Sequence, residues 1–412
     1  MSRCPASPLM AVPDPSIPEC LRPEEAVRPR APRTVTWTVG AAVALAIVPP
    51  LAGADWIVTR YDDPVPDGCL VDDCSLREAV IAANATDASH RILLSAGRYE
   101  LEIAGTAENA SATGDLDLAT SIELVGPGAT MTTIDGNGLD TVLQLLDPDP
   151  GDGFRPEITI RGLTVTGGVS TSAGDAGLTA SRVLATIEAC DLRENAPGFG
   201  IGAHTFADVD LRDTTIAGNG GGFHNVQADV LIENSTIAGN DGFELQVTSA
   251  PSSLTCRHCT IADPADSDLE IFVSQAGVVV ELVNSVVAGN CSATSDGDIV
   301  SLGGNLESPG DTCTLDQGSD QVSVADAQLG ALADNGGPTR TMIPAAESDV
   351  LDLALAAECL AADQRGFERN PAGIDCDRGA VEVGLDDPPT PIFHDGFEQG
   401  DGEAWSEQVG EA

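Results

Sequence analysis

The residues of this chain that could catalyse a reaction are one histidine and a few carboxylates in repeated sequence contexts. Three phenylalanines recur at similar places, and a different residue follows each one: Phe199-Gly200, Phe223-His224 and Phe243-Glu244. Aligning the phenylalanines predicts that His224 and Glu244 are neighbours on adjacent strands, with Asp241 and Asn219 close by. A histidine beside a carboxylate can exchange protons with a substrate. The pair under exposed aromatic rings is therefore a candidate acid–base site on a sugar-binding face.

A simpler interpretation of these residues is an inward stack of phenylalanines with a surface ion pair beside it. Only one His–Glu pair appears in the alignment, and no Arg or Lys accompanies it. We favour this simpler interpretation, and His224, Glu244 and Asp241 remain weak catalytic candidates.

Acidic residues elsewhere offer oxygen ligands for a divalent cation. Asp115 and Asp117 flank one leucine, and Asp147, Asp149 and Asp152 lie in a short stretch with Pro and Gly. Carboxylate oxygens are ligands that Ca²⁺ prefers, so Asp115 and Asp117 are candidate calcium ligands. The 65 acidic residues make such clusters expected by composition, and a solvated loop explains the second group equally well. No other cofactor is expected.

The segment Cys256-Arg257-His258-Cys259 has the CxxC spacing of a pair of zinc ligands. Zinc would need a second pair of ligands nearby, and none is evident in the sequence. Two small residues in a buried column, or a strained local disulfide, explain the pair more simply. The remaining histidines stand alone in sequence, and we interpret three of them as structural or surface residues: His90, His204 and His394.

The composition limits the possible partners. The 412 residues include 65 acidic and 19 basic residues, and every basic residue is arginine, for a net charge of −46. Phosphate groups are bound by clustered cations, so this charge argues against nucleic acid and predicts a soluble protein that attracts divalent cations. The sequence has no phosphate-binding loop, no Gly-x-Ser-x-Gly and no His-Glu-x-x-His. A nucleotide partner is not expected.

The candidate residues belong to a series of similar segments between residues 158 and 290. Each segment has an alternating apolar pair, two polar residues, a second apolar pair and a Gly or Asn stop. The segments are ITIRGLTVTGG, ATIEACDLREN, VDLRDTTIAGN, VLIENSTIAGN, LTCRHCTIADP and VELVNSVVAGN. Steps of 21 to 27 residues without helical periodicity predict a solenoid in which each repeat is one coil.

Aligning the segments gives one column of residues that tolerate the left-handed conformation of a tight corner. This corner column is Gly162, Ala189, Asp213, Asn234, His258 and Asn284. Two flanking apolar columns are assigned to the interior: Ile160, Ile187, Leu211, Ile232, Cys256 and Leu282, and Val165, Leu192, Ile216, Ile237, Ile261 and Val287. The residues just before the corner alternate in charge until the last one: Arg161, Glu188, Arg212, Glu233, Arg257 and then Val283. Opposite charges on neighbouring coils attract each other, so this alternation is favourable on an exposed surface.

We therefore predict an all-β fold, a right-handed parallel β-helix with a short N-terminal capping helix and a disulfide-stapled C-terminal segment. Ser75 and Glu78 form a capping box before an amphipathic helix. That helix has one apolar face: Leu76, Ala79, Val80 and Ala83. Residues 116–118 and 122–126 are expected to form strands of the first full coil, and residues 298–306 the last strand with its turn.

The N-terminus has the features of an export signal. Three arginines precede an apolar stretch, Val35–Val48, and Ala52-Gly53-Ala54 has the form of a cleavage site. The alternative is a single membrane anchor, but the segment is marginal for spanning a bilayer and contains Pro49 and Pro50. Export to an oxidising compartment agrees with locally spaced cysteines that suggest three disulfides: Cys69–Cys74, Cys291–Cys313 and Cys359–Cys376.

We divide the chain into five parts on these grounds. They are an N-terminal extension with signal peptide (1–54), an N-terminal cap (55–100), the β-helix coils (101–325), a C-terminal segment (326–384) and a flexible acidic tail (385–412).

Several of these stretches resemble modules of exported bacterial proteins. CSLREAVIAANA (Cys74–Ala85) resembles the signature of CSLREA-domain proteins, in which it precedes parallel β-helix repeats. LGALADNGGPTRTMIP (Leu329–Pro344) and the stretch Cys359–Glu382 resemble the choice-of-anchor Q domain. The tail around Ile392–Glu398 is similar to a short C-terminal motif of exported proteobacterial proteins. The resemblance implies export, surface association and a β-helix, and it implies no catalytic residues.

The leading functional hypothesis is a secreted or cell-surface β-helix protein without enzymatic activity. It would bind glycan or other surface ligands, or act as an adhesin or structural rod. The alternative is an extracellular carbohydrate-active enzyme, a polysaccharide lyase or glycoside hydrolase, with its site on one face of the helix. A monomer is expected.

Overall fold

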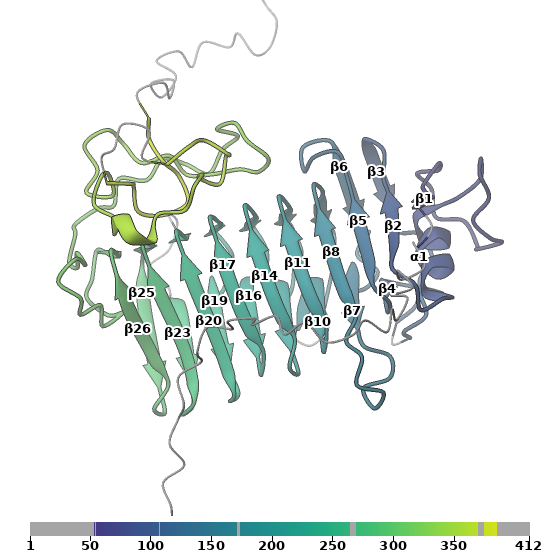
Figure 1. Cartoon of the computed structure of the whole chain (residues 1–412), viewed down its shortest axis with the longest axis horizontal. Helices are drawn as coiled ribbons and strands as arrows, with labels where there is room; N and C mark the ends of the chain where they lie inside the picture. The colour runs from purple at the N-terminus through teal and green to yellow at the C-terminus, as the bar shows by residue number, and fades with distance from the viewer. Residues whose placement is uncertain are drawn as a thin grey trace, which may run out of the picture. The chain divides into compact units, whose positions relative to one another are not determined.

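The structure is a computed structural model that describes residues 53, 55–106, 108–170, 174–263, 269–369 and 375–384 (Figure 1). The expected export signal, apart from Gly53, and the tail motif around Ile392–Glu398 lie outside the described residues. Within the described part of the chain, no helix is both long enough and apolar enough to cross a bilayer.

The described chain is a stack of coils, and each complete coil contributes one strand to each of three parallel sheets (Figure 1). The ten-stranded sheet contains β1 (Asp55–Ile57), β2 (His90–Leu93), β5 (Ile122–Val125), β8 (Glu157–Arg161), β11 (Leu184–Glu188), β14 (Asp208–Arg212), β17 (Asp229–Glu233), β20 (Ser252–Arg257), β23 (Val278–Val283) and β26 (Asp298–Gly303). The prediction of a parallel β-helix is confirmed.

The other two sheets follow the same order of coils. The nine-stranded sheet contains β3 (Gly97–Glu100), β6 (Thr132–Asp135), β9 (Thr164–Thr166), β12 (Asp191–Arg193), β15 (Thr215–Ala217), β18 (Thr236–Ala238), β21 (Thr260–Ala262), β24 (Val286–Ala288) and β27 (Leu306–Ser308). The eight-stranded sheet contains β4 (Leu116–Leu118), β7 (Leu143–Leu146), β10 (Asp175–Ser181), β13 (Phe199–His204), β16 (Gly221–Val226), β19 (Leu245–Thr248), β22 (Leu269–Ser274) and β25 (Asn290–Thr294).

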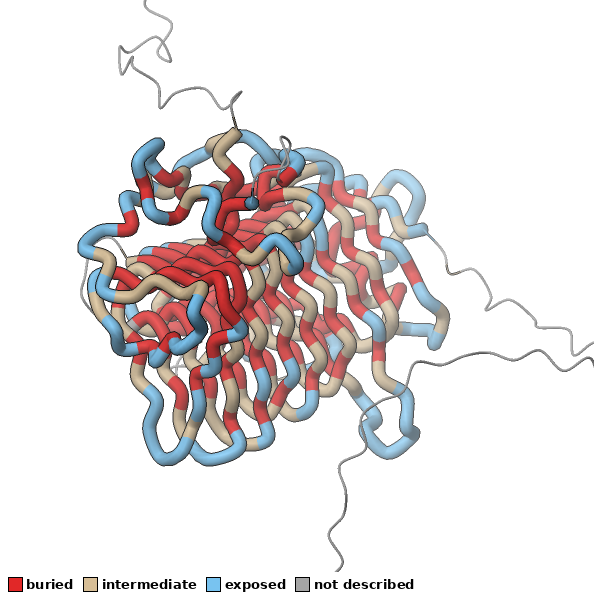
Figure 2. Tube along the Cα trace, turned by 60° about the vertical axis from the view of Figure 1, so that its left-hand side comes forward, coloured by how far each residue is buried: buried red, intermediate tan, exposed pale blue. Residues whose placement is uncertain are grey.

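The predicted interior columns pair in register from coil to coil. Ile187 lies between Ile160 and Leu211, and Leu192 lies between Val165 and Ile216. The members of both columns are fully buried, so the core is a set of continuous aliphatic ladders (Figure 2). Burying each branched side chain contributes roughly 1.5–3 kcal/mol to the stability of the folded state. A shift of strand register by one residue would remove the whole column from the core.

The predicted corner column is also confirmed. All six of its residues have positive φ, between 45° and 67°, including Ala189 and His258, which are not typical of that conformation. The corner holds the two flanking strands at a fixed angle, and its left-handed residue recurs at each passage from the ten-stranded to the nine-stranded sheet between β8 and β24.

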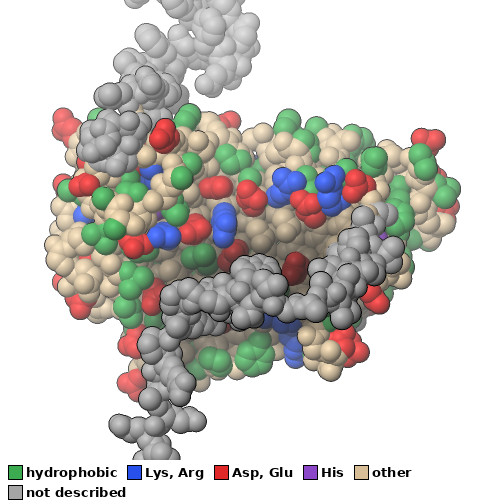
Figure 3. All heavy atoms as spheres, viewed as in Figure 1, with side chains coloured by type: hydrophobic (Ala, Val, Ile, Leu, Met, Phe, Trp, Pro, Cys, Tyr) green, Lys and Arg blue, Asp and Glu red, His purple; other side chains and the backbone are tan. Residues whose placement is uncertain are grey.

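The residues of alternating charge, which precede the corner residues, stack from coil to coil in the predicted order. Arg212 is paired in register with Glu188 and Glu233, and Glu233 with Arg257. The Glu233 carboxylate lies 3.6 Å from the Arg212 guanidinium and 3.5 Å from that of Arg257. Figure 3 shows basic and acidic side chains alternating across this side of the ten-stranded sheet.

The predicted capping helix is α1 (Leu76–Asn84), and both halves of its capping box are present. It is more deeply buried than one apolar face requires, because Arg77 and Glu78 are also buried. The coils also begin earlier than predicted, since β2 and β3 precede the strands of residues 116–118 and 122–126.

The three expected disulfides are present: Cys69–Cys74, Cys291–Cys313 and Cys359–Cys376. The remaining described cysteines, Cys190, Cys256 and Cys259, are free and buried. Cys256 and Cys259 therefore fill the core, as the simpler interpretation of this pair expected. Burial raises the pKa of the Cys259 thiol, so neither metal binding nor redox chemistry is favoured there.

In its described part, the segment after β27 contains one short helix, η1 (Ala356–Glu358). The segment packs against the coils. A column of threonines at the start of strands in the nine-stranded sheet holds it. Thr215 donates to the carbonyl of Arg340, and Thr236 donates to the Gln364 side chain at 2.7 Å. Arg340 also forms a bidentate ion pair with Asp191, at 2.9 Å for each contact.

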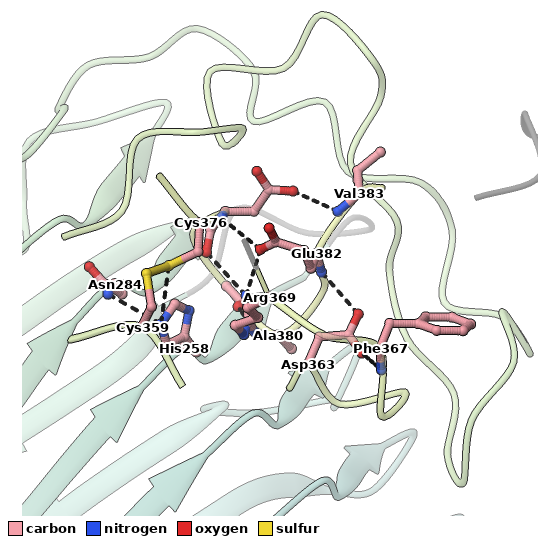
Figure 4. Close-up of polar contacts among 12 residues, drawn as sticks. His258, Asn284, Cys359, Asp363, Phe367, Arg369, Cys376, Ala380, Glu382 and Val383 are labelled. Carbon is pink, nitrogen blue, oxygen red and sulfur yellow. Dashed lines mark hydrogen bonds and ion pairs between the residues drawn. A yellow bond between two sulfur atoms is a disulfide. The ribbon is translucent and has the colours of Figure 1, made fainter. Parts of the chain in front are cut away.

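A second contact joins this segment to the corner column (Figure 4). The Arg369 guanidinium, fully buried, donates to Asn234 at 2.9 Å and lies 3.4 Å from Glu382. His258 lies beside Asn284 and the Cys359–Cys376 disulfide. Burial and the Arg369 charge hold the pKa of His258 well below its usual value, so it is a neutral packing residue.

The buried pair of Arg77 and Asp63 should anchor the N-terminal end. Arg77 forms two hydrogen bonds with Asp63 at 2.7 and 2.9 Å, and it donates to the carbonyls of Ser111, Gly114 and Asp115. Replacing Arg77 by Met leaves a buried carboxylate without its cation, so we expect a loss of about 3–5 kcal/mol in the free energy of unfolding. Chemical denaturation of the wild type and R77M measures this loss.

The matched control is R91M, because Arg91 forms an exposed ion pair with Asp55 at 3.4 Å. Exposed pairs contribute less than about 1 kcal/mol. Equal effects of the two substitutions would contradict an anchoring role for Arg77.

Candidate functional site

The site is the outer face of the eight-stranded sheet. Strand residues alternate there between the core and the surface, as in β16, where Phe223 and Asn225 are buried and His224 is partly exposed. The pairing of successive strands places one outward residue per coil in a single column. In order along the stack, this polar column is Asp117, Gln144, Thr179, Gly202, His224, Gln246, Phe272 and Ser292. Asp117, at the N-terminal end, is fully buried.

The predicted pairing of His224 with Glu244 is wrong. His224 is paired in register with Gly202 and Gln246, and the backbone carbonyl of Glu244 accepts from Phe223. The phenylalanines do not form one column either, because Phe199 lies opposite Gly221 and Phe223 lies opposite Ile201. The loops that join the nine-stranded sheet to the eight-stranded sheet differ in length, so aligning the phenylalanines shifted the predicted pairing by two residues.

Glu244 is buried in the interior instead of on the face. Its carboxylate accepts from the backbone and side-chain nitrogens of Asn240. Asn240 accepts from Asn219, and Asn219 accepts from Asn195, each at about 3 Å through the side-chain amides. Glu244 therefore ends an internal asparagine ladder that satisfies the backbone of the turns. Asp241 is exposed at the surface of its turn, and its backbone nitrogen donates to Asn219.

His224 instead lies beside Asp175 and His204. Asp175, His204 and His224 come from β10, β13 and β16, and their possible ligand atoms all lie within 4.8 Å of one another. The Asp175 side chain is only 4% exposed, whereas His204 and His224 are 25% and 18% exposed. The sequence hid this cluster because His204 and Asp175 lie at opposite ends of their strands and outside the aligned segments.

Two features of the backbone let Asp175 reach the histidines. The strand pairing is irregular between Asp175 and Leu178, and Gly202 has no side chain where the carboxylate lies. Thr179 donates to the carboxylate at 3.3 Å, and His204 Nε2 contacts the same oxygen. Burial raises the pKa of Asp175, but the two imidazoles outweigh burial, and the pKa lies below its usual value. The carboxylate is therefore charged.

Aromatic rings lie along the same outer face. The Phe199 ring stacks on the His224 imidazole, with centroids 4.8 Å apart, and covers Gly221. Two coils further on, Phe243 stacks on Phe272 with centroids 5.1 Å apart. These four rings are partly exposed. Together with the amides and hydroxyls of the polar column, they form a half-buried surface with both apolar faces and hydrogen-bonding groups.

The calcium candidates lie at the N-terminal end of this face. Asp115, Asp117 and Glu108 bring carboxylate oxygens within 4.8 Å of one another. With its amide oriented by its hydrogen bonds, Gln144 donates to Asp115 at 3.2 Å and to Asp117 at 3.1 Å. Burial raises the pKa of Asp115 to about 8 and that of Asp117 to about 6. Calcium binding here stays a prediction.

The residues of the second acidic group, Asp147, Asp149 and Asp152, form hydrogen bonds within their own loop. Each carboxylate accepts from a backbone nitrogen of the same loop, at 2.7 to 3.3 Å. The loop borders a cleft of about 810 Å³ beside α1, together with Phe154 and Asn84. The solvated-loop interpretation accounts for these three residues.

Comparison with known proteins agrees with the architecture. A family model described as a right handed beta helix region matches residues 153–319. Among solved structures, pectate lyase Pel9A is similar with 14% identity and a TM-score of 0.42, over 81% of this chain and 97% of that one. The A-module of the mannuronan C-5 epimerase AlgE6 of Azotobacter vinelandii is similar with 14% identity and a TM-score of 0.30, over 64% and 94%.

A comparison with curated proteins gives no match. The three parallel sheets and the match to the family model show that the chain is a right-handed parallel β-helix protein. A fold alone does not define what its face binds.

Glu244 should make stability depend on pH. Burial raises its pKa to about 8 from an ordinary value near 4.5, so the folded state holds the proton more tightly than the unfolded state. This contribution to stability is fully present below pH 4.5 and is lost as the pH rises to about 8. We therefore expect E244Q to lose less stability than the wild type between pH 5 and pH 8, as measured by denaturation midpoints.

The control is D241N, a neutralisation three residues away at an exposed position. Its pH profile should parallel that of the wild type. Parallel profiles for E244Q and the wild type would show that Glu244 is ionised in the folded protein throughout this range.

Proposed function

We propose that this protein is exported and binds polysaccharide along the outer face of the eight-stranded sheet. The observation that carries the proposal is the pair of aromatic stacks, Phe199 with His224 and Phe243 with Phe272, beside the polar column. Aromatic faces pack against the apolar faces of sugar rings, and amides and hydroxyls bind sugar hydroxyls. A mostly apolar surface with a few placed polar groups is the usual composition of such sites.

The charge of the chain favours an uncharged glycan. The net charge of −46 repels polyanions, and the polar column carries amides and hydroxyls at Gln144, Thr179, Gln246 and Ser292. An acidic polysaccharide would need bridging cations to approach this surface. The partly exposed residues of the column run from Gln144 in β7 to Ser292 in β25, so the face suits an extended chain of several sugars better than a single sugar.

The proposal includes the family resemblance of the sequence. We propose that residues 74–85 are a CSLREA motif and that residues 329–382 are a choice-of-anchor Q segment. Under this proposal the protein is secreted or held at the bacterial surface, and the β-helix presents its glycan-binding face outward.

A carbohydrate-active enzyme is the second candidate, and one observation favours it. His224 faces the buried, charged Asp175 carboxylate at 3.5 Å and lies under Phe199 on the same surface. A histidine held by a carboxylate can act as a general base. Release of reducing ends, or of unsaturated products, from any polysaccharide in a panel would distinguish the enzyme from a binding protein, provided that H224A abolishes it.

Removing the aromatic stacks should weaken glycan binding. We expect F199A and F272A each to lower the affinity for neutral polysaccharides by about tenfold, equivalent to about 1.4 kcal/mol. Affinity electrophoresis in gels containing a β-glucan, a xylan or a galactomannan measures the change, with alginate and pectate as the acidic comparison.

The matched control is F367A, because Phe367 is an exposed aromatic residue in the C-terminal segment that packs under Arg365. Its affinity should equal that of the wild type. No retardation of the wild type by any polysaccharide, or equal retardation of F199A, F272A and F367A, would contradict the proposal.

A further inference from the structure

The cluster of Asp175, His204 and His224 has the composition of a transition-metal site. It offers two imidazole nitrogens and one carboxylate oxygen on three successive coils. Imidazole suits zinc, copper, iron and nickel, whereas Ca²⁺ and Mg²⁺ take oxygen ligands. The set therefore differs in kind from the purely acidic group of Glu108, Asp115 and Asp117.

The separations of the atoms fit one small cation. Zn²⁺ binds nitrogen and oxygen ligands at about 2.0–2.2 Å, so two ligands of a tetrahedral site lie about 3.4 Å apart. The Asp175 Oδ1 and His224 Nδ1 atoms are 3.5 Å apart, and His204 Nε2 lies against the other carboxylate oxygen. A modest movement of the His204 side chain, which is a quarter exposed, would open the space for an ion.

Two buried atoms of the cluster have no hydrogen-bond partner among the residues that the structure describes. Asp175 Oδ1 and His224 Nδ1 face each other in a buried position, yet they do not form a hydrogen bond. An unsatisfied buried polar atom destabilises the folded state. A cation bound between these two atoms would satisfy both of them, because each has a lone pair to offer.

The surroundings hold the three side chains in place. Gly202 leaves room for the carboxylate, since a Cβ atom there would lie 1.9 Å from Asp175. Phe199 stacks on the His224 ring, and the His204 ring meets it edge-on with centroids 5.4 Å apart. Thr179 donates to the carboxylate from the preceding coil. Such outer partners orient metal ligands in known sites.

We propose that Asp175, His204 and His224 bind one Zn²⁺ or a similar transition-metal dication on the outer face of the eight-stranded sheet. Three protein ligands leave a fourth coordination position, and the partial exposure of both histidines directs it to the solvent. The site would thus hold a metal with an open position beside Phe199. This inference does not rest on the proposed glycan binding and stands if that proposal fails.

The test is metal binding by the folded, oxidised protein. Zn²⁺ affinity is measured by competition with a chromophoric chelator, in a millimolar excess of Mg²⁺ that occupies the acidic surface. We expect one tight site per chain, and Co²⁺ bound there should give visible absorption bands of tetrahedral strength. We expect H224Q and D175N to weaken binding at least about 100-fold, because loss of an outer partner alone costs about 10–100-fold.

Two control variants separate the site from the rest of the chain. H90Q removes a histidine from β2, outside the cluster, and E244Q removes a buried carboxylate from the same region of the coils. Both should bind zinc as the wild type does. F199A should weaken binding about tenfold while retaining one site.

Three outcomes would overturn the proposal. One is a wild type without a tight zinc site in excess Mg²⁺, and another is cobalt bands of octahedral strength only. The third is affinity unchanged in H224Q and D175N. If a ligand variant fails to fold, as judged by circular dichroism, the cobalt spectrum of the wild type still decides the question.

Discussion

The fold depends on keeping equivalent residues in file from one coil to the next. Parallel strands lie about 4.8 Å apart, so an aliphatic side chain in one coil packs directly on its equivalents above and below. A single shift by one residue would expose an entire column. The left-handed corner residues enforce this register, because each fixes where a strand of the ten-stranded sheet ends and the next begins. Every other feature of the described chain relies on that alignment.

The strand register also explains why polar and aromatic side chains from different coils lie together on one face. A column of the eight-stranded sheet brings together neighbours that are 20 to 35 positions apart in sequence, such as Gln144 with Thr179 and His224 with Gln246. Neighbouring coils need no sequence similarity at these outward positions, since the core alone maintains the stack. The outward face can therefore change while the interior stays aliphatic, and aromatic rings, amides and the Asp175 cluster occupy it here.

Buried arginines tie the irregular parts of the chain to the regular coils. Arg77 joins the cap to the loop before β4, and Arg369 joins the C-terminal segment to the corner column. Guanidinium groups suit this role because they offer five donors in a rigid plane and stay charged. In a chain with so many carboxylates, each buried arginine also neutralises nearby acids. This use of a few cations inside the structure leaves the surface strongly acidic.

The strands, the corner and the interior columns were determined by the sequence itself. These features follow local rules: an apolar residue at every second position, a residue tolerant of positive φ between two strands, and charges that alternate along the stack. The capping helix and the three disulfides could also be predicted, because their partners are close in sequence. Such patterns are visible in the sequence because each repeat must form the same strands and the same corner.

Only the tertiary structure decided the site. The loops that join the nine-stranded sheet to the eight-stranded sheet differ in length, and no local rule sets the register of the eight-stranded sheet. His224 therefore meets Asp175 and His204 instead of Glu244, which turns inward to end the asparagine ladder. A shift in strand register after Asp175 and the missing side chain at Gly202 make the new contact possible. The effect of these two features depends on how three coils pack together, and the sequence of a single segment does not determine that packing.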